Sequence, residues 1–201
     1  MYFFTHLFIA KVLYQHLSET VDLDYKAFSY GNIKPDLPST TRKHHTLDNY
    51  LETVCIKADS LKEEEMTVED FSEELGEICH YISDFFCYYH LNETLHKRSL
   101  KHFSYEILTH LTLFPNRISE NYSFTTPLVS SGISIEETIS TMREQYFQKE
   151  KSIKRDMEFA LSTSLLISEA ILDCVQFSTP ASMDLEMADQ RMISLSPMVT
   201  L

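Results

Sequence analysis

Glycine and proline are scarce in this sequence of 201 residues, which has three glycines and six prolines confined to a few places. Strand-rich domains need many turns, and turns consume both residue types, so the scarcity favours long helices. No apolar run reaches the roughly 18 residues of a membrane-spanning helix, and none is expected. Hydrophobic residues make up 43% of the chain, which excludes a wholly disordered protein.

The chain also lacks any CxxC pair and any basic segment at its start. Its apolar first residues are interrupted by His6 and Lys11, so they make a poor signal peptide. Buried free thiols in a reducing compartment are the simplest interpretation of the cysteines, and we expect a cytoplasmic protein. These cysteines are Cys55, Cys79, Cys87 and Cys174.

Basic residues are fewer than acidic ones, and the formal net charge is −13. A chain this acidic repels the phosphate backbone of nucleic acid and the anionic surface of bilayers. Bound divalent cations would reverse the sign at one site and leave the rest negative. No nucleic-acid partner is therefore expected.

Helical periodicity and capping signals dominate what is present. Thr67 with Asp70, and Ser134 with Glu137, have the spacing of capping boxes. We predict an all-α multi-helix bundle, with one domain over residues 1–180 and a C-terminal tail over 181–201, docked or loose. Helices are predicted over 4–18, 22–30, 46–63, 67–90 and 93–113, with one or two more over 134–178 and loops over 31–38 and 115–132.

The candidate functional residues are an array of histidines and carboxylates. His80 and Asp84 lie four positions apart, and His102 and Glu106 repeat that spacing, so each pair shares a helix face. With His90 they give H-x3-D-x5-H, eleven further residues, then H-x3-E. Imidazole and carboxylate suit zinc, manganese or iron. Two such helices facing each other in a bundle can enclose more than one ion.

The sequence position of Asp84 supports a metal site. A lone His–Asp pair could also be joined by a simple hydrogen bond. Asp84 lies between Ile82 and the Phe85–Phe86 pair, where its carboxylate would be buried. A buried carboxylate without a charged partner is costly, and a metal ion would supply that partner.

The array resembles the zinc-dependent phospholipase C family of bacteria, which includes secreted phosphatidylcholine-cleaving enzymes and clostridial alpha toxin. The resemblance runs from about His6 to Glu106 and implies an all-helical domain that holds zinc ions between its helices. The family pattern also has an early His, an Asp in a Pro-Asp loop and a later His. These fall on His6, Asp36 and His45, with His44 a close competitor of His45.

The resemblance further implies the site residues, two or three zinc ions, and a phospholipid or small phosphodiester as substrate. The zinc cluster would lower the pKa of a bridging water, and Asp36 would be a ligand that also takes the proton from that water. The implied ligand sets are Asp36, His45, His80 and Asp84 for one ion, His90, His102 and Glu106 for a second, and His6 with the bridging Asp84 for a third.

Two features depart from that family. In the secreted enzymes the mature N-terminal residue, exposed by removal of a leader, completes the third site. Here no leader is visible, and Met1 stands only five positions before His6 and next to the bulky Tyr2. We therefore expect a third site that is absent, weak or completed by another group. Nothing after Glu106 resembles the β domain with which the toxins dock on membranes.

Three other interpretations remain open. Glu77-x-x-His80 and Glu93-x-x-His96 match the spacing of ferritin-like di-iron bundles. Zinc nucleases of plants and fungi share a related helical fold, although the negative charge opposes that function. A non-enzymatic, metal-stabilised helical domain is the main alternative to a hydrolase. The sequence leaves the substrate head group and the oligomeric state open.

Overall fold

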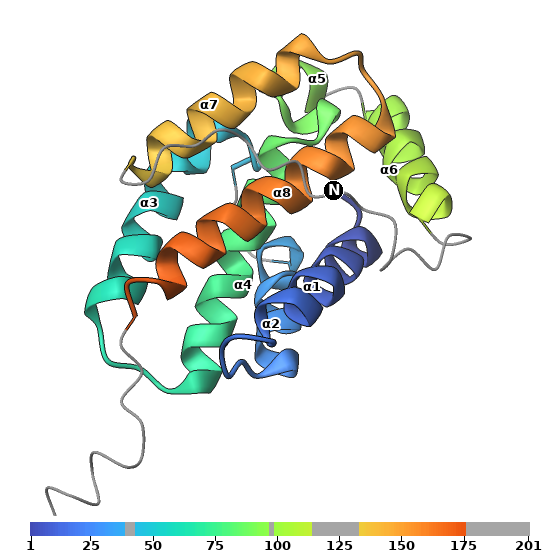
Figure 1. The fold of residues 1–201 in the computed structure, drawn as a ribbon. Coiled ribbons are helices and arrows are strands. Elements are labelled where there is room, and N and C mark those ends of the chain that lie inside the picture. The colour runs from blue at the N-terminus through green and yellow to red at the C-terminus, as the bar shows by residue number, and fades with distance from the viewer. Residues whose placement is uncertain (39–42, 97–98, 114–132, 176–201) are drawn as a thin grey trace, which may run out of the picture.

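The computed structural model describes residues 1–38, 43–96, 99–113 and 133–175, and within them it contains helices and no strand (Figure 1). The all-α prediction is confirmed. The α-helices are α1 (Phe3–Leu17), α2 (Tyr25–Gly31), α3 (Leu47–Glu63), α4 (Val68–Phe85), α5 (Glu93–His96), α6 (Ser99–Leu113), α7 (Ile135–Gln148) and α8 (Ile153–Leu172), and the short 3-10 helices are η1 (Lys34–Asp36) and η2 (Tyr88–His90).

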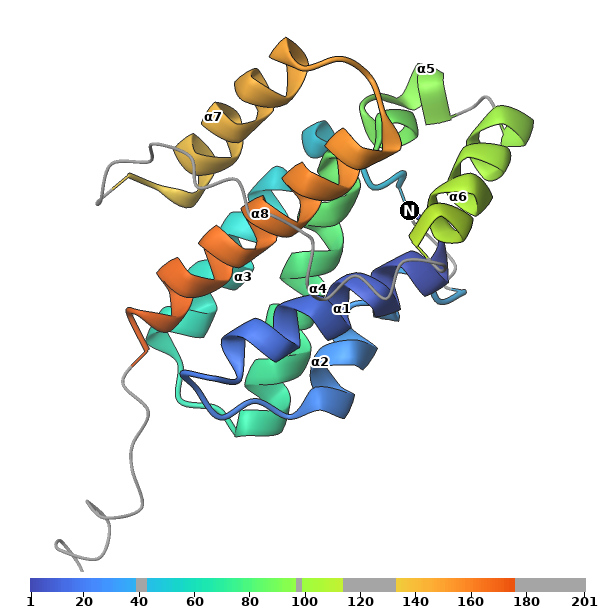
Figure 2. The ribbon, with the colours of Figure 1, turned by 45° about the vertical axis from the view of Figure 1, so that its right-hand side comes forward.

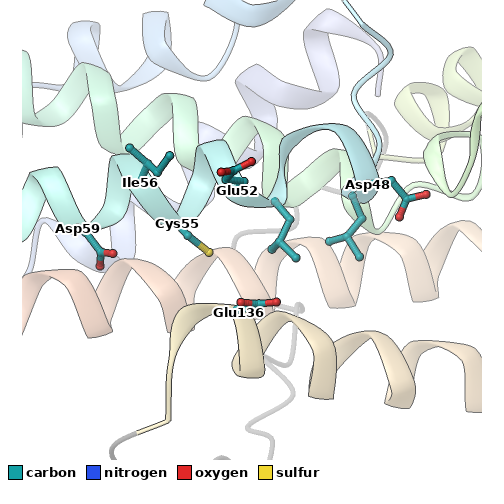
Figure 3. A pocket seen from close by; sticks show the side chains of 8 residues that line it. Asp48, Glu52, Cys55, Ile56, Asp59 and Glu136 are labelled. Carbon is teal, nitrogen blue, oxygen red and sulfur yellow. The ribbon is translucent and has the colours of Figure 1, made fainter.

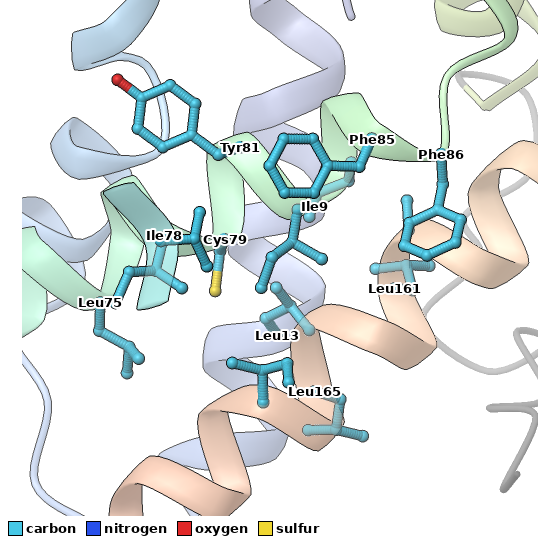
Figure 4. Packing of buried hydrophobic residues seen from close by; sticks show 14 of the residues in the cluster. Ile9, Leu13, Leu75, Ile78, Cys79, Tyr81, Phe85, Phe86, Leu161 and Leu165 are labelled. Atoms are coloured by element: carbon cyan, nitrogen blue, oxygen red, sulfur yellow. The ribbon is translucent and has the colours of Figure 1, made fainter. Parts of the chain in front are cut away.

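Helix α4 lies at the centre of the bundle and packs against α1, α2, α3 and α8, while α7 covers α8 and α3 from outside (Figures 1 and 2). Because neighbours surround it, every residue from Ile78 to Phe85 is buried. Apolar side chains of α1 and α8, such as Ile9 and Leu161, meet those of α4 in the core (Figure 4). The same burial places His80 and Asp84 inside the protein.

Two of the three glycines allow α2 and α4 to approach closely. A Cβ atom at Gly31 would overlap the backbone of Glu73, and one at Gly76 would overlap the carbonyl oxygen of Phe28. This approach sets the end of α2 against α4, where the carbonyl oxygen of Asn32 accepts a hydrogen bond from His80 Nδ1 at 2.8 Å. The glycine contact therefore helps to orient a candidate ligand.

Replacing Gly76 with alanine is expected to destabilise the fold by about 1–3 kcal/mol, because the added methyl group forces the two helices apart. Urea unfolding followed by circular dichroism measures the change. Glu69→Ala, at an exposed position of the same helix, is the control and should alter stability far less. Equal unfolding midpoints for Gly76→Ala and the parent would contradict the close contact.

The predicted helix over 67–90 is wrong at its C-terminal end, since α4 stops at Phe85. The N–H of Tyr88 donates to Asp156 Oδ2 of α8 at 2.8 Å instead of continuing the helix ladder. Arg143 of α7 holds the same turn by donating to the carbonyl oxygens of Phe85 and Leu91. These partners lie far away in the sequence, so helical periodicity could not reveal them.

Other predicted boundaries agree closely with the structure. The Ser134–Glu137 capping box is present, and the stretch after it forms two helices, α7 and α8. Thr67 caps α4 by accepting from the N–H of Asp70. The predicted loop over 31–38 contains η1, and the predicted helix over 93–113 appears as α5 and α6. The loop over 115–132 and the tail over 181–201 fall outside the described residues, so the division into a domain and a tail stays a prediction.

Candidate metal centre

One group of donor atoms gathers where α1, η1, the start of α3 and α4 meet. One donor atom from each of Asp36, His45, His80 and Asp84 lies within 4.8 Å of the other three. Asp36 comes from η1, His45 from the segment before α3, and His80 and Asp84 from consecutive turns of α4. Three parts of the chain that lie far apart in the sequence thus converge on one point.

The spacing within this group is that of ligands around one ion. His45 Nδ1 lies 2.9 Å from His80 Nε2 and 3.1 Å from Asp84 Oδ2. Asp36 Oδ1 lies 3.7 Å from His45 Nδ1 and 3.8 Å from His80 Nε2. Ligands at about 2.0–2.1 Å from a tetrahedral zinc ion are roughly 3.3 Å apart. The four side chains therefore suit a single zinc ion with small adjustments.

His45 rather than His44 lies in this group. His45 is buried, whereas His44 is partly exposed and its carbonyl oxygen accepts from Asn49 and from the N–H of Thr46. His80 is held with Nε2 toward the group, because its Nδ1–H donates to Asn32. Burial lowers the pKa of His80 well below its usual value, and the neighbouring His6 acts in the same direction. His80 is therefore a neutral imidazole with a nitrogen free to bind metal.

A second group lies beside the first, between η2 and α6. His90 Nε2 lies 3.0 Å from His102 Nε2, and Glu106 Oε1 lies 3.2 Å from His90 and 2.9 Å from His102. Six positions correspond to about 240° around a helix. Had α4 continued, His90 would point away from Asp84, so the turn after Phe85 brings it into the site.

Asp84 joins the two groups and is fully buried. Its Oδ2 lies 3.2 Å from His90 Nδ1, and its Oδ1 lies 3.4 Å from His6 Nε2. Burial alone would raise the pKa of Asp84, but His90, the Met1 amine, His6 and the hydrogen bond from His45 together hold that pKa well below its usual value. The carboxylate is ionised and surrounded by donor nitrogens.

The α-amine of Met1 is a group near the site that sequence reasoning did not assign. It contacts Asp84 Oδ1, and it lies 3.2 Å from His90 Nε2 and 3.4 Å from Glu106 Oε1. Burial lowers the pKa of this amine, yet the carboxylates of Asp84 and Glu106 outweigh burial and raise it to about 12. The amine thus lies between the carboxylates of the two groups.

The surroundings of His6 provide a separate test of whether these residues could bind metal. The ring of His6 is fully buried and stacks on His80 with centroids 3.9 Å apart. Neither of its ring nitrogens makes a hydrogen bond to the residues that the structure describes. A buried polar group without a hydrogen bond is costly, and metal coordination would satisfy Nε2, which already lies near Asp84 and 3.9 Å from Asp36 Oδ2. The residues present therefore fit a cluster of metal ions.

A hollow between α3 and α7 is another concave feature of the protein (Figure 3). Four carboxylates and the thiol of Cys55 line it, together with exposed Ile56, and it contains no histidine. Its carboxylates are Asp48, Glu52, Asp59 and Glu136. Without a base of intermediate pKa or mixed ligands, it is a weaker candidate for chemistry than the histidine site.

Comparison with known proteins gives one match. A family model described as zinc dependent phospholipase C matches residues 5–157, which include all eight predicted site residues. Neither a curated protein nor a solved structure matches the chain. No helix among the described residues is long and apolar enough to cross a membrane.

Proposed function

This chain belongs to the zinc-dependent phospholipase C family, and from that premise we propose that it hydrolyses a phosphodiester bond in a phospholipid or a related small ester. The convergence of two His–carboxylate groups on the shared Asp84 is the observation that carries the proposal. Metal-dependent phospholipase-like chemistry follows from membership of the family, and we further propose the ligands and the group that accepts the proton.

We assign the ligands to two ions, with a third position beside them. The first ion is held by the group around His80, the second by the group around His102, and His6 with Asp84 forms the third position. The Met1 amine contacts Asp84 next to that position. The complete proposed ligand set is His6, Asp36, His45, His80, Asp84, His90, His102 and Glu106.

Asp36 is the side chain that we assign to proton transfer. It is 27% exposed, whereas the side chains of the other seven proposed ligands are at most 14% exposed. Bound zinc ions lower the pKa of a coordinated water and offset the charge of a phosphodiester. Asp36, at the open side of the group, can take a proton from such a water, while buried Asp84 orients His45 and His90.

Hydrolysis assays test the proposal directly. Zinc-loaded protein is expected to cleave a chromogenic phosphodiester and to release the head group from phosphatidylcholine vesicles, and a chelator should abolish both activities until zinc is restored. Protein that retains a full complement of zinc without turnover of lipid, nucleotide or small diesters would instead support a metal-stabilised helical domain. Cleavage of single-stranded DNA alone would favour the nuclease-like alternative.

A further inference from the structure

Cys87 is a buried thiol that neither the predicted ligand set nor the proposed function uses. It occupies the turn between α4 and η2 and is 2% exposed. Its Sγ makes no hydrogen bond to the described residues. Cys79, the other buried thiol, has its Sγ 3.4 Å from Ser168 Oγ, so it is accommodated in the core as a partnered thiol. Cys87 needs a different explanation.

The surroundings of Cys87 are those of a metal ligand. Its Sγ and one donor atom each from His90 and Glu106 all lie within 4.8 Å of one another. A zinc ion holds sulfur at about 2.3 Å and nitrogen at about 2.0–2.1 Å, which brings such atoms to roughly 3.6 Å in a tetrahedral site. Cys87 and Glu106 also line the same small cavity, together with Met1. A small movement of the Cys87, His90 and Glu106 side chains would bring the three donor atoms within bonding distance of one ion.

We propose that Cys87 is a thiolate ligand of the second metal ion, beside His90 and Glu106. This inference rests on the proposed metal cluster. On binding, the Sγ–H bond gives up its proton to solvent and the sulfur electron pair forms the bond to the metal, so no oxidant or reductant is needed. His102, 3.0 Å from His90 and 2.9 Å from Glu106, would supply the fourth side chain once it moves toward Cys87.

Four protein ligands would give the second ion a closed shell. Structural zinc sites are closed, whereas catalytic sites keep a position for water. The second ion then fixes the turn after α4 to α6, and hydrolysis takes place at the first group, where Asp36 is the most exposed ligand. Cys87 thereby divides the cluster into a structural part and a catalytic part.

Cobalt substitution tests this assignment without using activity. Full-length protein loaded with Co2+ is expected to show sulfur-to-cobalt charge-transfer absorption in the near ultraviolet. Cys87→Ser should lose that absorption and bind its second ion at least about tenfold more weakly. Cys79→Ser should keep both properties, because that thiol is equally buried but lies outside the cluster.

A second variant keeps the test decisive if Cys87→Ser does not fold. In the triple variant Cys55→Ser, Cys79→Ala, Cys174→Ser, Cys87 is the remaining thiol, and the charge-transfer absorption should persist. Cobalt bound without that absorption in the parent protein would overturn the Cys87 proposal and leave the proposed metal cluster standing. Failure to bind cobalt or zinc at all would overturn both.

Discussion

Asp84→Asn is expected to reduce tightly bound metal to below about one equivalent per chain, because this carboxylate is shared by both groups. Asparagine has nearly the same shape, so the core around it is preserved, but it carries no charge to balance a cation. Its neighbours His6 and His90, 3.4 and 3.2 Å from the carboxylate, also lose their ionised partner. Elemental analysis after dialysis measures the effect, and circular dichroism checks that the variant is folded.

Glu77→Gln is the matched control for this experiment. Glu77 lies about two turns before Asp84 on α4 and pairs with Lys34 and Lys57 outside the cluster. Its variant should keep the full metal content. Loss of iron from Glu77→Gln, with metal retained in Asp84→Asn, would favour the ferritin-like alternative and remove Asp84 from the centre of the site.

The sequence predicted the candidate ligands on α4 and α6 because spacing within one helix fixes which side chains share a face. His80 with Asp84, and His102 with Glu106, needed no knowledge of the tertiary structure. Asp36 and His45 lie in or beside loops, where helical periodicity makes no prediction about which side chains meet. They came from the family resemblance, and the structure brings both to His80.

The sequence does not reveal the distant contacts that position some of these groups. His90 reaches the site because α4 ends at Phe85, and the helix ends there because Tyr88 bonds to Asp156, 68 positions later in the chain. Cys87 lies in that same turn and reads as an ordinary core cysteine in the sequence. The sequence assigned no role to the Met1 amine, and this amine contacts Asp84.

Asp156 shows how α8 supports the site. This buried carboxylate accepts from Tyr105 Oη at 2.7 Å and from Tyr146 Oη at 2.9 Å, and it pairs with the adjacent Arg155. Tyr105 precedes Glu106 on α6, so the network ties α8 to the helix that carries the second group. Burial raises the pKa of Asp156 although these donors and Arg155 lower it. No sequence pattern marks these partners, and only the fold brings them together.

Asp36→Asn is expected to lower turnover of a phosphodiester by about 10²- to 10⁴-fold while most of the metal is retained. The asparagine oxygen can still face His45 and His80, but it cannot accept a proton from water near neutral pH. Steady-state kinetics and metal content should be measured on the same preparation. Asp48→Asn, an exposed carboxylate close to His45 in sequence, is the control and should keep full activity. Unchanged turnover in Asp36→Asn would assign proton transfer to another group. A loss of metal in parallel with turnover would mean that Asp36 acts only as a metal ligand.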